Sequence, residues 1–132
     1  MIYLLDTNAA SAALRGHPAV DARLQALSPG AWGVSAVTCS ELRYGLALRP
    51  GAHRLQQLVE GFLEVTPVLA WDEAAATRHA SLRAHLRSLG TPLGNFDEMI
   101  AAHALAVGAV LVSADRAFAR VPQLQVENWT AL

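Results

Sequence analysis

Four acidic residues occupy positions in the sequence where side chains commonly do chemistry. Asp6 ends the apolar run Ile2 to Leu5, and Asp115 follows a second apolar run, AVLVS, in the same manner. Glu41 and Asp97 fall in the first turns of two expected helices. Crowded carboxylates repel one another and raise at least one pKa unless a divalent cation offsets their charge. Ligands that are all oxygen suit Mg²⁺ or Mn²⁺, which points to phosphodiester chemistry.

Each acid, taken singly, also has a purely structural interpretation. Asp is a preferred N-cap, and negative charge is stabilising near a helix N-terminus. The segment Thr38 to Glu41 matches a capping box. The joint pattern favours a site, because three of the five Asp in the chain stand at strand ends or helix starts that should meet at one edge of a sheet.

The elements that would position these acids alternate between short apolar runs and longer helical patterns, which is typical of a mainly parallel sheet with crossover helices. The pattern predicts strands near residues 2–5, 33–37, 65–69, 109–113 and 124–127. It predicts helices over 7–15, 18–27, 39–48, 52–63, 72–89 and 96–107. Gly90 should end the fifth helix in the left-handed conformation, and Gly108 should close the sixth. In such sheets ligands bind beyond the carboxyl ends of the strands, where the strand order reverses.

Composition narrows the class of protein. With 132 residues and a mass of 14.0 kDa, the chain fits one domain over 1–132. No apolar window of about 20 residues is free of charge, and no basic segment precedes the first apolar run, so we expect a cytoplasmic protein without a membrane span or signal peptide. The net charge of −1 is unlike that of a globally basic nucleic-acid binder. All ten basic residues are Arg, which disfavours phosphate sites that depend on Lys.

Hydropathy and histidine placement add two expectations. The hydrophobic fraction of 53% suggests that apolar surface remains once the core is filled, so we expect an oligomer or a bound partner. None of the five His is spaced to pair with a nucleophile. His79 lies on an apolar helical stripe, and His103 lies off the helix face that carries Asp97. We expect both to pack rather than to react.

Four motifs, LLDTN, SELRYG, GNFDEMIAAHA and LVSADRAFARVPQL, occur in an order and spacing that resemble the PIN domain, most closely the VapC-type toxins of bacterial and archaeal toxin–antitoxin pairs. The resemblance covers essentially the whole chain, including the closing VENW. It implies an α/β fold of three layers, with a parallel sheet of strand order 3-2-1-4-5 flanked by helices. Asp6 and Asp115 would then be neighbours where the strand order reverses.

The resemblance also implies a site and an activity. The acidic quartet of the family would be Asp6, Glu41, Asp97 and Asp115, which would bind one or two Mg²⁺ or Mn²⁺ ions. Asp115 falls at the most variable of these positions, so its contact with metal is either direct or through water. Thr7 and Ser113 match small polar positions that orient the carboxylates, with Thr7 placed to orient Asp6. The implied activity is that of an endoribonuclease toxin, which hydrolyses structured RNA, either tRNA or rRNA, with metal-activated water.

Substrate and partner contacts follow from the same resemblance. RNA phosphates must be met by basic side chains near the acids. The candidates are Arg83 and Arg87, which are neighbours at i,i+4, and also Arg43 and Arg78. A solvated face is the alternative for each of them. Asn95 would either cap its helix or touch the substrate. The resemblance further implies a homodimer and a cognate VapB-type antitoxin, which would block the site and bring the toxin to DNA indirectly.

Two other functions stay open at this point. A metal-dependent phosphohydrolase would use Asp6 as a phosphate acceptor, but dehalogenase-like phosphatases carry a second Asp where this chain has Asn8, and they usually also need a Lys. The other alternative is a catalytically silent dimeric module that binds nucleic acid or a regulator, in which the acids only cap helices.

Overall fold

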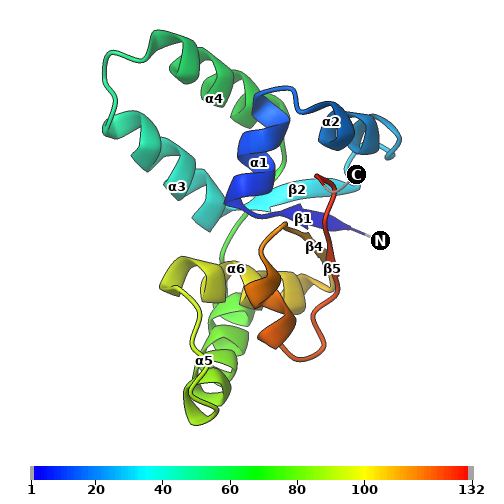
Figure 1. Cartoon of the computed structure of the whole chain (residues 1–132), viewed down its shortest axis with the longest axis vertical. Coiled ribbons are helices and arrows are strands. Elements are labelled where there is room, and N and C mark those ends of the chain that lie inside the picture. Colours follow the sequence, from blue (N-terminus) through cyan, green and yellow to red (C-terminus); the bar gives the residue numbers. More distant parts are fainter. Residues whose placement is uncertain (1, 131–132) are drawn as a thin grey trace.

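The computed structural model describes residues 2–130, which form a five-stranded sheet covered by helices on both faces (Figure 1). The strands are β1 (Tyr3–Leu5), β2 (Trp32–Ser35), β3 (Val68–Leu69), β4 (Val110–Val112) and β5 (Val126–Glu127). Their order is β3-β2-β1-β4-β5, and every neighbouring pair is parallel. The predicted fold class and strand order are therefore confirmed, with the order reversing between β1 and β4.

Six α-helices and a short 3₁₀-helix connect the strands. They are α1 (Thr7–Leu14), α2 (Pro18–Gln25), α3 (Ala36–Ala47), α4 (His53–Val65), α5 (Glu73–Ser88), α6 (Asn95–Val107) and η1 (Arg116–Arg120). In the part of the chain that the structure describes, no helix has the length and apolarity needed to cross a membrane.

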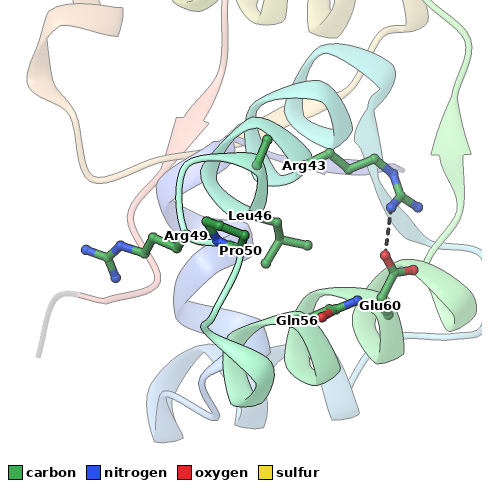
Figure 2. A pocket seen from close by; sticks show the side chains of 7 residues that line it. Arg43, Leu46, Arg49, Pro50, Gln56 and Glu60 are labelled. Carbon is green, nitrogen blue, oxygen red and sulfur yellow. Dashed lines mark hydrogen bonds and ion pairs between the residues drawn. The ribbon is translucent and has the colours of Figure 1, made fainter.

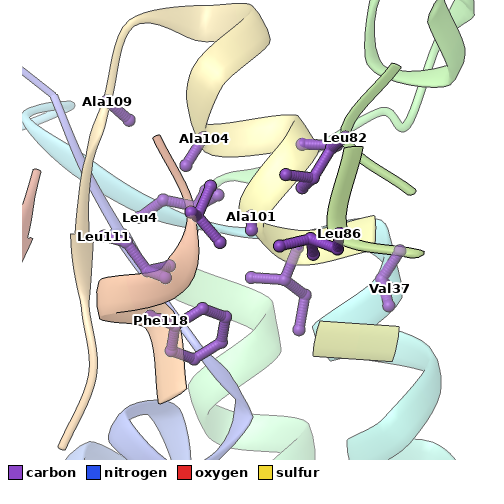
Figure 3. Packing of buried hydrophobic residues seen from close by; sticks show 12 residues of the cluster. Leu4, Val37, Leu82, Leu86, Ala101, Ala104, Ala109, Leu111 and Phe118 are labelled. Carbon is purple, nitrogen blue, oxygen red and sulfur yellow. The ribbon is translucent and has the colours of Figure 1, made fainter. Parts of the chain in front are cut away.

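The two central strands are buried on both sides, which explains why their sequences are apolar without interruption. Successive strand side chains point to opposite faces, so Leu4 packs with the α5 and α6 layer while Leu5 packs with α1, α2 and α4. Leu111 joins the cluster of Leu4 (Figure 3), and Val112 joins that of Leu5. The ends of β1 and β4 are thereby held firmly by two hydrophobic cores.

Helix α3 begins three residues earlier than predicted, at Ala36 rather than residue 39. Ser35 ends β2 and is the N-cap, because its Oγ accepts a hydrogen bond from the backbone N–H of Val37 at 3.1 Å. The capping box read at Thr38 is therefore wrong, and Thr38 lies buried inside the helix. Glu41 accordingly lies in the second turn of α3 and not in the first.

The other boundaries agree closely with the sequence pattern. Gly90 and Gly108 both adopt positive φ values of 68° at the ends of α5 and α6, as their lack of a Cβ allows. Strand β3 is shorter than predicted because α4 continues to Val65. The 3₁₀-helix η1, which begins directly after Asp115, was not predicted.

Candidate functional site

Asp6 lies at the carboxyl end of β1 and is only 4% exposed. Its backbone N–H donates to the carbonyl of Val112 at 3.0 Å, which joins the end of β1 to the end of β4. Its Oδ1 accepts the N–H of Ala9 at 2.8 Å and so caps α1. Burial raises the pKa of Asp6, hydrogen bonds from Ser113 and Ala9 lower it, and repulsion from Asp115 and Glu41 raises it further.

Asp97 lies in the first turn of α6 and is partly buried. The N-cap of this helix is Gly94, and no side chain caps it, so Asp97 is not needed to begin the helix. Burial raises the pKa of Asp97, and repulsion from Asp115, Asp6 and Glu41 adds to the rise.

The causes of these pKa shifts indicate that the four predicted acids lie close to one another at one edge of the sheet. Every charged group that alters the pKa of Asp6 or Asp97 is another member of the quartet, and no arginine is among them. Asp115 is exposed and also caps a helix, since its Oδ1 accepts the N–H of Ala117 at 2.9 Å. The purely structural interpretation accounts for Asp6 and Asp115 as caps and for Asp97 in the first turn of a helix, but it gives no reason for Glu41.

Two hydroxyl groups hold the carboxylates. Thr7 Oγ1 donates to Glu41 Oε1 at 2.5 Å. Thr7 therefore orients Glu41, and the expectation that it orients Asp6 is wrong. The Ser113 hydroxyl donates to Asp6, and its oxygen accepts the backbone N–H of Asp115 at 3.0 Å. Ser113 therefore connects two members of the quartet, and Thr7 fixes a third.

The donor set fits a hard cation that retains water. Within residues 2–130, no three Asp, Glu, His or Cys side chains approach closely enough to enclose a metal ion by themselves. Mg²⁺ and Mn²⁺ do not need such a cage, because Mg²⁺ in particular keeps several waters and uses one or two carboxylates. A divalent cation at this edge would relieve the repulsion that raises the pKa values of Asp6 and Asp97.

The structure separates Arg43 from the acidic edge. Arg43 follows Glu41 by two positions on α3, and helix residues with that spacing do not face the same side. Its Nη1 pairs with Glu60 Oε1 at 2.8 Å across an open hollow of about 370 Å³ between α3 and α4 (Figure 2). No member of the acidic quartet lines this hollow.

The other predicted RNA contacts remain exposed or partly exposed. Arg83 is partly buried on α5 and Arg87 is exposed, and neither alters the pKa of Asp6 or Asp97. Asn95 is the first residue of α6 and is exposed, two positions before Asp97. It does not cap the helix, so the capping alternative is wrong for this residue.

Sequence reasoning missed a buried acid beside the site. Glu98 is 2% exposed, its Oε2 accepts the N–H of Leu93 at 3.3 Å, and its Oε1 lies 3.8 Å from His79 Nε2. Trp71 contacts the His79 ring edge-on. Spacing gave one signal, because Glu98 precedes the buried residues Ala101 and Ala102 by three and four positions, but its place in the first turn of α6 ordinarily indicates an exposed acid.

His103 packs in the core, as predicted. It is 1% exposed, and its Nδ1 lies 2.7 Å from the Oγ of Ser35, the N-cap of α3. Burial lowers the pKa of His103, while Asp72 raises it to a smaller extent. This contact ties α6, which carries Asp97, to the start of α3, which carries Glu41.

Comparisons with known proteins agree with this architecture. Residues 3–124 match the family model of the PIN domain. A "tRNA(fMet)-specific endonuclease VapC" of Shigella flexneri is 37% identical over 129 residues, which cover 97% of this chain and 98% of that protein. A "Ribonuclease VapC2" of Rickettsia felis is 32% identical over 98% of both chains.

Solved structures give the same assignment. The crystal structure of VapBC2 from Rickettsia felis, bound to a DNA fragment from its promoter, contains a chain that matches with a TM-score of 0.90 and 31% identity over 98% of this chain and 99% of that one. DNA-bound VapBC from Salmonella typhimurium also reaches a TM-score of 0.90, with 34% identity over 98% of each chain. Family model, curated relatives and solved structures thus converge, and this chain belongs to the PIN-domain family, within its VapC group.

Proposed function

We propose that this chain is the toxin of a VapBC-type pair and acts as a divalent-metal-dependent endoribonuclease. The proposal rests on four acids, Asp6, Glu41, Asp97 and Asp115, that lie close enough at the carboxyl edge of the sheet to repel one another, which raises the pKa values of Asp6 and Asp97. Such an edge accumulates negative charge that a cation must offset before a phosphate can approach. The names of the VapC relatives, which describe ribonucleases and endonucleases, support the same reaction class.

In this proposal Asp6, Glu41 and Asp97 hold one or two Mg²⁺ or Mn²⁺ ions, and Asp115 contributes directly or through water. The ions would activate a water and neutralise charge on the phosphoryl oxygens. The protein contributes fixed geometry, because the Ser113 hydroxyl holds Asp6 and Thr7 holds Glu41. The burial of Asp6 keeps bulk water away from one wall of the site.

Water, and not the 2′-hydroxyl of the RNA, is the proposed nucleophile. The products should then carry a 5′-phosphate and a 3′-hydroxyl. A transfer RNA is the favoured substrate, since the Shigella flexneri and Salmonella typhimurium relatives are both named as tRNA(fMet)-specific endonucleases. Sequence-specific RNA recognition usually targets unpaired loops, so the cleaved bond should lie in a single-stranded loop of a structured RNA.

The proposed partners are a second copy of the chain and a VapB-type antitoxin. The similar structures from Rickettsia felis and Salmonella typhimurium are VapBC complexes with DNA, which supports an antitoxin that carries the toxin to its promoter. Large apolar side chains that are unusually exposed support contact surfaces on this chain. Tyr44 on α3 and Leu48, the C-cap of α3, are 65% and 63% exposed, and Phe96, beside Asp97, is 52% exposed.

Sequencing of RNA ends after brief induction tests the proposed function. Wild-type protein should produce new 5′-phosphate ends at one site in one RNA, and chelation of divalent metal should stop cleavage by the purified protein. Asp6→Asn should lower the rate by about 100- to 1000-fold, the usual effect of removing one preorganised electrostatic group. Asp21→Asn, on exposed α2, is the matched control and should cut normally.

The Asp6→Asn variant also separates the nuclease from a silent module. Asn caps helices about as well as Asp, so a residue that only capped α1 would tolerate the change. New ends that persist in Asp6→Asn cells would contradict the nuclease, as would 2′,3′-cyclic phosphate ends in wild-type cells.

A further inference from the structure

A second open hollow, about 530 Å³ in volume, begins where the acidic site ends. Ser113 and Asp115 line it, and both residues also belong to the acidic edge. The rest of its wall comes from η1, from β5 and from the short segments next to them. A polymer whose reacting bond lies at the carboxylates therefore has this hollow immediately beside it.

The wall of this hollow combines a small apolar surface with polar groups. Ala119, Leu124 and Val126 supply the apolar part, and Val126 is 37% exposed on the edge strand β5. Arg116 is exposed at the hollow, and across residues 2–130 it makes no ion pair. Asn128 Oδ1 accepts hydrogen bonds from Thr130, so its amide NH₂ is the group left to donate to a ligand.

This combination matches a nucleotide better than it matches a purely apolar or purely anionic ligand. A nucleobase has apolar faces and a polar edge, and the phosphate attached to its sugar carries the charge that an arginine attracts. Arg116 is the basic residue that lines the hollow, and it directly follows Asp115, so it could contact such a phosphate. Because the hollow shares Ser113 and Asp115 with the acidic edge, the nucleotide that it holds should adjoin the cleaved bond.

We propose that this hollow, which we name the base pocket, holds a nucleobase next to the scissile phosphate, while Arg116 contacts the adjoining phosphate. The base pocket then sets part of the sequence preference. This inference rests on the proposed function, because it names how the same site holds RNA.

Filling the base pocket provides the first test. Ala119 is exposed on η1, so Ala119→Phe places a ring in the hollow without disturbing a core position. Ala84→Phe, an exposed α5 position that does not line the hollow, is the matched control. The substrate is the structured RNA that contains the mapped cleavage site, together with versions in which each nucleotide next to that site in turn lacks its base.

The kcat/KM of the wild-type protein should fall about tenfold when one base adjoining the cleaved bond is absent, which matches the usual free energy of stacking one base on a protein. Ala119→Phe should show the same loss on intact RNA and no additional loss on that abasic RNA. Ala84→Phe should behave as wild type. The base pocket would be excluded if the Ala119→Phe change and the missing base lowered kcat/KM independently, so that their effects multiplied. It would also be excluded if Ala119→Phe were as active as Ala84→Phe on intact RNA. A wild-type protein that cuts no RNA would instead contradict the proposed function.

A binding measurement tests Arg116 separately. In the Asp6→Asn background, where cleavage is blocked, binding of labelled RNA is followed by fluorescence anisotropy over a range of salt concentrations. Arg116→Ala should reduce the slope of log Kd against log salt by about 0.7, the value for one phosphate contact on a single strand. Arg54→Ala, on exposed α4, is the control and should leave the slope unchanged. An unchanged slope in Arg116→Ala would exclude the phosphate contact.

Discussion

The hydroxyl of Thr7 donates to Glu41 Oε1 at 2.5 Å, which joins the first residue of α1 to the second turn of α3. Thr7 directly follows Asp6, so this bond sets the position of Glu41 relative to the end of β1. Thr38 Oγ1 lies 3.4 Å from the same hydroxyl and packs against it from α3. The two acids therefore depend on one hydroxyl for their relative geometry.

Thr7→Ala should lower catalytic activity more than it lowers folding stability. A hydrogen bond to a charged group is worth about 1.5–3 kcal/mol, and its loss frees Glu41 to leave the site. We expect a drop of about tenfold or more in kcat/KM, with the metal concentration needed for half-maximal activity raised. Thr7→Ser retains the hydroxyl and should retain most activity. Equal activity in the Ala and Ser variants would show that the bond has no role in the site.

Divalent metal should stabilise the folded protein in a pH-dependent manner. A ligand that binds only the folded state at 100 times its Kd adds about 2.7 kcal/mol. Because the pKa values of Asp6 and Asp97 are raised, protons compete with metal at a higher pH than for ordinary Asp residues. The rise in Tm with Mg²⁺ should thus be largest at neutral pH and should fade as the pH falls through these raised values.

The same melting experiment has an internal control. Asp6→Asn should lose most of the Mg²⁺-induced rise in Tm, whereas Asp21→Asn, away from the acidic edge, should keep it. An equal rise in all three proteins would mean that Mg²⁺ binds elsewhere.

His103 should make folding stability sensitive to mild acid. Its folded-state pKa lies below the ordinary value of 6.5 because it is buried, so the unfolded chain binds more protons as the pH falls below that value. The contribution of His103 is therefore fully present above pH 6.5 and declines between the unfolded and the folded pKa. His103→Gln should flatten this part of the profile of unfolding free energy against pH, measured in urea. His85→Gln, on the exposed face of α5, should leave the slope in place.

Glu98→Ala should destabilise the fold without removing a member of the acidic quartet. The change leaves the N–H of Leu93 without its buried acceptor, and an unsatisfied buried polar group costs about 1–3 kcal/mol. Urea unfolding should report a loss of this size for Glu98→Ala and a smaller one for Glu98→Gln, whose amide oxygen can still accept from Leu93. Glu73→Ala, exposed on α5, should change stability by much less. A Glu98→Ala protein as stable as wild type would show that the carboxylate is not needed there.

The central strands, and the strand ends near Asp6 and Asp115, were predictable because the signals are local. An uninterrupted apolar run that ends on an acid marks a buried strand and its carboxyl end, as at Asp6 and Asp115. The start of α3 was missed because Val37 extends the β-branched pattern, while Ser35 and Thr38 are both good caps. Only the packing of the helix decides between them.

Contacts between elements distant in the sequence were beyond local signals. Glu98 follows Asp97 in the first turn of a helix, where an acid is ordinarily exposed and favoured by the helix dipole. Its burial depends on how α5 lies against α6. Likewise, the choice of Glu41 as the partner of Thr7 depends on the distance between α1 and α3, which no spacing within the sequence reports.

The bond between His103 and Ser35 also bears on how the protein is controlled. Because it fastens α6 to the cap of α3, the helices that carry Asp97 and Glu41 form one rigid frame with the ends of β1 and β4. In this structure these contacts hold the acids in one arrangement. We therefore expect silencing to come from a cover supplied by another chain, so that the lifetime of that cover would decide when the protein acts.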